Sequence, residues 1–160
     1  MAITQALTAS FRGELLLGSH DFRADGQTGA DAFKLSLYTS TASIDANTVA
    51  YLATNEVTGT NYTAGGQALV NLGVTITNVN ATTGIGFCDF TDLTFANSTI
   101  TARGALIYNT TPSTNSNANT TLTNASVVVL DFGADKTSTD GDFTIIFPAA
   151  SSSAAIIRIA

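Results

Sequence analysis

The chain has 160 residues, with 12 acidic against 6 basic side chains and a formal net charge of −6 at pH 7. Charged residues make up only 11% of it, so the polar surface must be built mainly from its 27 Thr, 13 Ser and 12 Asn. The length fits a single domain. The two lysines and four arginines are scattered, which argues against binding to nucleic acid or to an anionic membrane surface.

One cysteine and one histidine exclude two further classes of protein. Cys88 has no second cysteine to pair with, so the chain is not a disulfide scaffold, and we expect a small buried apolar residue there. The composition also argues against a zinc site, because such a site needs several Cys or His ligands and the chain has one of each. No apolar run approaches the 18 residues of a membrane span, and the run Leu15–Leu17 is too short for an export signal. We therefore expect synthesis in a cytoplasm without export.

The first element that the sequence predicts is a short N-terminal helix over residues 4–17. Leu7, Phe11 and Leu15 recur at four-residue spacing, and Gly18 is a suitable stop. The same segment has apolar residues on more than one helix face, whereas a helix at the edge of a domain buries a single stripe. The surplus predicts a contact surface for a partner, made of Phe11, Leu15, Leu16 and Leu17.

Strand patterns follow for most of the chain. Residues 32–39 alternate, with Phe33, Leu35 and Leu37 on one face, which predicts a half-buried strand. Residues 47–54 fit a short helical turn, and residues 55–66 fit an ordered loop ending in two glycines. Further strands are expected at 67–77, with Leu69, Leu72, Val74 and Ile76 available for burial, and at 85–95, 100–109, 126–132, 142–147 and 154–159.

The sequence also predicts the connections between these strands. A turn is expected at 78–84, a bend near Asp89 or Asp92, and a bulge at Arg103-Gly104. Residues 110–124 are rich in Asn and Thr and predict a long exposed loop. Together the pattern predicts one all-β domain over residues 1–160, a β-sandwich or jelly-roll-like fold with the helix packed at one end.

Few residues have catalytic potential, and an ordinary structural role explains each of them. His20 stands between Ser19 and Asp21, but consecutive side chains of an extended segment point to opposite faces and cannot form a relay, so a polar turn is expected. Asp89 and Asp92 lie among aromatic residues, which is a cue for a raised pKa and acid–base chemistry. The alternative that we favour is two strand-end carboxylates that accept backbone hydrogen bonds.

A cation site is the remaining candidate. Asp135, Asp140 and Asp142 lie on a glycine-containing stretch, and clustered carboxylates can bind Ca²⁺. Asp and Gly are also the commonest turn formers, and the spacing of a calcium-binding loop is missing. We therefore expect a turn there, no cofactor, no catalytic residues and no enzymatic activity.

Five segments together resemble a family of small structural proteins of tailed bacteriophages, often without an assigned function: 33–51, 55–74, 100–111, 127–148 and 156–160. The resemblance runs from about Phe11 to Ala160. Its most specific parts are Tyr62–Gly66, Arg103–Asn109 and Leu130–Thr137. Against that family, the stretch 110–124 looks like an insertion.

The resemblance implies a virion component made in the cytoplasm of the bacterial host. The leading expectation is a capsid decoration (cement) protein that stabilises the head as a homo-oligomer, often a trimer, bound to the major capsid protein. A tail, neck or baseplate component is the alternative. A third possibility is a host-attachment or glycan-binding module that displays Tyr51, Tyr62 or Tyr108 from its loops.

Overall fold

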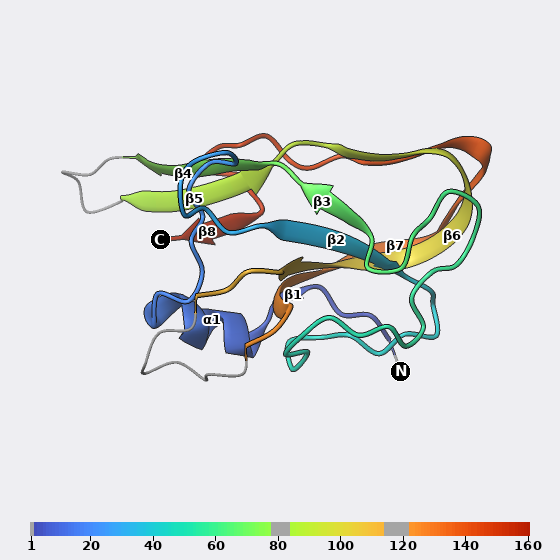
Figure 1. Ribbon diagram of the computed structural model, residues 1–160, viewed down its shortest axis with the longest axis horizontal. Helices are drawn as coiled ribbons and strands as arrows, with labels where there is room; N and C mark the ends of the chain where they lie inside the picture. Colours follow the sequence, from blue (N-terminus) through green and yellow to red (C-terminus); the bar gives the residue numbers. More distant parts are fainter. Residues whose placement is uncertain (1, 78–83, 114–121) are drawn as a thin grey trace.

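The computed structural model describes residues 2–77, 84–113 and 122–160 (Figure 1). They form one helix and eight strands: β1 (Ala6–Leu7), α1 (Ala9–Leu16), β2 (Phe33–Tyr38), β3 (Gln67–Leu69), β4 (Asn71–Thr77), β5 (Ile85–Phe90), β6 (Leu93–Asn109), β7 (Ala125–Ile145) and β8 (Ile157–Ile159). The turn expected at 78–84 and most of the loop expected at 110–124 lie outside the described residues.

The strands form two antiparallel sheets. One has five strands in the order β1-β7-β6-β2-β3, and the other has three in the order β4-β5-β8. Only Val70 separates β3 from β4, so the chain passes from one sheet to the other there, within the segment expected to be one strand. Helix α1 lies at one end of the molecule (Figure 1). The predicted all-β sandwich with an N-terminal helix is confirmed.

The helix is shorter than expected because the residues before it pair with a strand. Ala6 and Leu7 lie opposite Val129 and Val128 of β7 and form β1. The chain turns into α1 after Thr8, whose side chain hydrogen-bonds to the Ser126 carbonyl rather than capping the helix. Tertiary pairing thus overrides the four-residue periodicity in the first part of the segment.

Strand β2 is buried on both faces, not half-buried as the alternation predicted. It lies between β6 and β3, so Phe33, Leu35 and Leu37 join the main core between the sheets. Its other face is covered by a second apolar cluster, which includes Tyr38, Ala42, Ile44, Leu106, Tyr108 and Val129. The loop after β2 supplies this cover, which a two-residue alternation cannot reveal.

The longest strands, β6 and β7, form one bent ribbon. It runs along the layer of β4 and β5, bends at the right of Figure 1 and returns through the five-stranded sheet. Register shifts allow the bend. One of them, between Ala102 and Gly104, confirms the expected bulge. The turn expected at 133–142 was wrong, because those residues continue strand β7, in which Lys136, Thr137, Ser138 and Gly141 pair with β6. The strand expected at 85–95 is interrupted at Thr91-Asp92, at one of the two places where a bend was expected.

The segment between β2 and β3 contains no helical turn at 47–54. A turn at 45–47 is followed by extended chain, in which Ala50 bridges to Ala125 and the Tyr51 N–H donates to the Asn124 carbonyl. The ordered loop expected at 55–66 is present. Gly66 has φ +67°, and a Cβ there would lie 1.7 Å from the Leu35 carbonyl oxygen, so only glycine fits this close approach.

Candidate functional site

The four residues predicted to contact a partner divide into core and surface. Phe11 is only 1% exposed and packs edge-on against His20 and Phe22, so it is a core residue and not an exposed one as expected. Leu15 is half-buried against the core. Leu16 is 91% exposed, and Leu17 is also exposed. The accessible part of the predicted surface therefore lies at the C-terminal end of α1.

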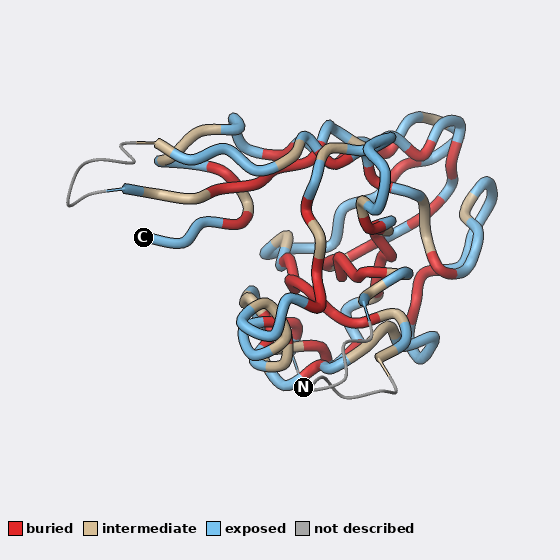
Figure 2. Tube along the Cα trace, turned by 60° about the vertical axis from the view of Figure 1, so that its left-hand side comes forward, coloured by how far each residue is buried: buried red, intermediate tan, exposed pale blue. Residues whose placement is uncertain are grey.

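The inner face of the three-stranded sheet adds apolar residues to this end of the molecule. Val74 pairs with Cys88, and Ile159 pairs with Gly86, so Val74, Ile76 and Ile159 point the same way as the buried Cys88. Yet they are 58%, 61% and 57% exposed. Figure 2 shows that the hairpin of β4 and β5 projects past the body of the molecule, so among the described residues nothing covers this part of the core face.

A groove separates this sheet from the helix. We call it the α1–β8 groove, with a volume of about 370 Å³ and a lining of Leu7, Phe11, Arg12, Leu15, Leu16, Ile157, Arg158, Ile159 and Ala160. It adjoins a smaller hollow of about 180 Å³ that is lined by Leu15, Phe22, Val74, Gly86, Phe87, Cys88, Ile157 and Ile159. Among the described residues, no Asp or Glu lines either space.

Two arginines mark the rim of the groove. Arg12 and Arg158 are exposed and make hydrogen bonds to backbone carbonyls, of Thr8 and Ser153 respectively. Within the described residues neither has a carboxylate partner, whereas the other two arginines pair with Asp21 and Asp135. In a chain with twice as many acids as bases, this rim is a local exception.

His20 follows the turn at the end of α1, where a polar turn was expected, and its side chain is buried in a polar network. Its Nε2 lies 2.9 Å from a Glu14 carboxylate oxygen, and its Nδ1 lies 3.0 Å from the Asn109 amide nitrogen, which also donates to Asp31. Because Asn109 Oδ1 accepts the Thr111 N–H, the amide nitrogen must face His20. His20 therefore donates from Nε2 and ties α1 to β6, which is a structural role.

The structure agrees with the structural roles that the sequence predicts for Asp89, Asp92 and Cys88. The Asp89 and Asp92 carboxylates accept the backbone N–H groups of Phe90 and Phe147, as expected for strand-end carboxylates. Burial raises the pKa of Asp89, whose second oxygen has no hydrogen-bond partner among the described residues. Cys88 is buried, and burial raises the pKa of its thiol to about 12, so it is not a ready nucleophile.

The three aspartates considered for Ca²⁺ do not converge. Asp135 pairs with Arg103, Asp140 exchanges hydrogen bonds with Thr99, and Asp142 accepts the Asn97 N–H. The described residues hold no group of three or more Asp, Glu, His or Cys side chains suited to a metal ion.

A buried carboxylate that sequence reasoning missed lies inside the loop after β2. Glu56 accepts hydrogen bonds from the hydroxyls of Tyr51 (2.6 Å) and Tyr62 (2.7 Å) and from the Gly65 N–H (2.7 Å). Tyr108 stacks on Tyr51 and donates to the Gly65 carbonyl. The tyrosines expected to face a glycan are thus held in this cluster. A lone Glu between two tyrosines of one loop was the available signal.

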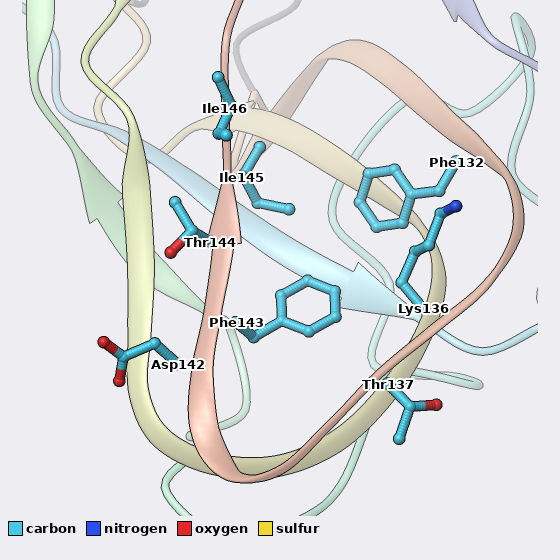
Figure 3. A pocket seen from close by; sticks show the side chains of 8 residues that line it. All are labelled: Phe132, Lys136, Thr137, Asp142, Phe143, Thr144, Ile145 and Ile146. Atoms are coloured by element: carbon cyan, nitrogen blue, oxygen red, sulfur yellow. The ribbon is translucent and has the colours of Figure 1, made fainter.

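A cavity of about 450 Å³ lies between the two limbs of β7. Figure 3 shows Phe132, Phe143 and Ile145 pointing into it, with Lys136 at its edge and Asp142 turned away. The polar groups around it do not converge on a common point, so it is an open side of the core rather than a reaction site.

The described helix, at eight residues, is too short to cross a membrane. Comparison with protein-family models, with curated proteins and with solved structures gives no match. The α1–β8 groove and the apolar residues beside it are therefore the candidate site, on physical grounds alone.

Proposed function

We propose that this chain is a structural, non-enzymatic subunit of a tailed-phage virion, and specifically a capsid decoration protein that stabilises the head. The resemblance of its sequence segments supports the virion assignment. The single observation that carries a docking role is the apolar surface of Leu16, Val74, Ile76 and Ile159 beside the α1–β8 groove, which no other described residue covers.

The size of this surface is sufficient for a docking role. The exposed fractions of the four side chains amount to between two and three whole aliphatic residues. Complete burial against a partner would contribute about 4–8 kcal/mol. A monomer gains nothing from leaving such a contiguous patch in water, and patches of this kind mark interaction sites. The acidic, Thr-rich remainder of the chain suits the outside of a particle rather than a DNA-lined interior.

A decoration experiment tests this proposal. Purified protein is added to particles of the encoding phage that lack it, and occupancy is measured by sedimentation and gel densitometry. The double variant Leu16→Asp and Ile159→Asp should lose most of its occupancy. Ile146→Asp, which changes an exposed isoleucine outside the groove lining, is the matched control and should bind normally. Undiminished binding of the double variant would refute the docking surface.

A tail, neck or baseplate position is the second candidate, since the same surface would serve an adaptor there. If the protein binds isolated tails and not heads in the same assay, that candidate replaces the first. We expect a homo-oligomer on the particle. Light scattering of the purified protein, measured over a range of concentrations, tests whether it also assembles alone.

A further inference from the structure

We propose that the α1–β8 groove receives an extended segment of a separate partner protein, in which apolar and acidic side chains alternate, as an added strand beside β8. The inference rests on the proposed docking role and names the chemistry of the partner. Three features of the groove carry it within the described part of the chain: a strand edge that has no partner strand, an apolar floor, and two arginines that have no carboxylate partner.

The free edge belongs to β8. This strand is the last of its sheet and pairs on one side with β5, through Ile157, Arg158 and Ile159. An unpaired strand edge is a template for a further strand, and proteins often use it to bind extended peptides. The other side of β8 adjoins the groove, whose opposite wall is α1 with the exposed Leu16.

The apolar floor fits the side-chain period of a strand. Ile157 and Ile159 point to the face that they share with Val74 and Leu15, whereas Arg158 between them points to the other face. A strand added at this edge would place every second side chain over the apolar floor. Its intervening side chains would lie next to Arg158.

The charges select an acidic segment over a second copy of this chain. A carboxylate beside Arg158 or Arg12 would pair with a charge that has no carboxylate partner among the described residues. By contrast, a two-fold pairing of β8 with β8 would centre on Arg158 and bring two like charges together. A separate partner with alternating acidic residues avoids this repulsion.

Two capped six-residue peptides test the inference: one alternates isoleucine and glutamate, and the other alternates isoleucine and lysine. Fluorescence anisotropy with labelled peptides should show saturable binding of the glutamate peptide, about ten-fold tighter than the lysine peptide. Arg158→Glu should reverse this preference, and Leu16→Asp should weaken binding of the glutamate peptide about ten-fold. Ile146→Asp should change neither. Amide chemical shifts should move at residues 157–159.

Several results would overturn the inference. They are equal binding of both peptides, no saturable binding of the glutamate peptide, or shifts confined to residues outside the groove. A wild-type dimer that Leu16→Asp dissolves would show that a second copy occupies the groove, and the proposal of an acidic partner would be wrong. If the glutamate peptide binds as expected but the groove variants do not change occupancy on particles, the decoration role alone would be refuted. Circular dichroism confirms that each variant is folded.

Discussion

Replacing Glu56 by glutamine should destabilise the fold through three hydrogen bonds at once. The carboxylate accepts from two tyrosine hydroxyls and from the Gly65 N–H, all at 2.6–2.7 Å. Hydrogen bonds to a charged group contribute about 1.5–3 kcal/mol each, against about 0.5–1.5 kcal/mol for neutral ones. Glutamine keeps the volume, but its amide oxygen accepts only neutral hydrogen bonds and its amide nitrogen cannot accept at all, so we expect a loss of about 2–4 kcal/mol.

Thermal and urea unfolding, followed by circular dichroism, measure this loss. For a domain of this size the expected change in Tm is a fall of about 5–15 °C. Asp25→Asn, an exposed carboxylate change, is the control and should leave Tm in place. The chain has no Trp and four Tyr, three of which contact Glu56 or Gly65, so near-ultraviolet dichroism reports on the cluster. An unchanged Tm in Glu56→Gln would refute the assigned role of the cluster.

Four further changes have expected outcomes. Burial raises the pKa of Tyr108 to about 12, so its contribution to stability should be complete below pH 10 and should fall as the pH rises from 10 through 12. Alkaline unfolding followed by tyrosinate absorbance measures this, and tyrosines that all ionise near pH 10 in the folded protein would contradict it. Burial raises the pKa of Asp89 above the value of 3.8 that it has in the unfolded chain, so ionising this carboxyl group lowers the stability of the fold above pH 3.8. Asp89→Asn should therefore stabilise the protein at pH 7, by about 1–3 kcal/mol in urea unfolding, and should have a smaller effect at pH 3. Gly66→Ala should cost more than about 3 kcal/mol because its Cβ would clash with backbone, whereas Gly13→Ala, on an open helix face, should gain up to about 1 kcal/mol; equal Tm values would refute the pair. His20→Ala should destabilise the fold by about 2–4 kcal/mol by leaving the Glu14 and Asn109 groups unpaired, and a Tm equal to that of the wild type would contradict this.

The sequence predicts the fold class well because strand composition and alternation are local signals. It fails where pairing between distant segments decides the outcome. The stretch 133–142 has turn residues, yet it continues strand β7, which pairs with β6 on both sides of it and at four positions within it. Ser36 and Tyr38 alternate with core residues, yet a loop covers them.

The sequence predicted the residues that α1 contributes to the candidate site, but not those that β4 contributes. The surplus of leucine on α1 pointed to Leu16 and Leu17, which are exposed. Val74 and Ile76 were expected in the core, because alternation shows which face is apolar but not how far the core extends beneath it. Only the three-dimensional arrangement shows that β4 projects beyond its cover (Figure 2). His20 was equally hidden, since its partner Asn109 is 89 residues away in sequence.

A cryo-electron microscopy map of the virion would show directly whether this chain decorates the head. We expect density for the chain on the head, with the α1–β8 groove and Leu16 buried against a neighbouring subunit and with an extended segment of that subunit beside β8. A map in which the chain is bound with this end facing solvent, or in which the particle lacks the chain, would contradict it.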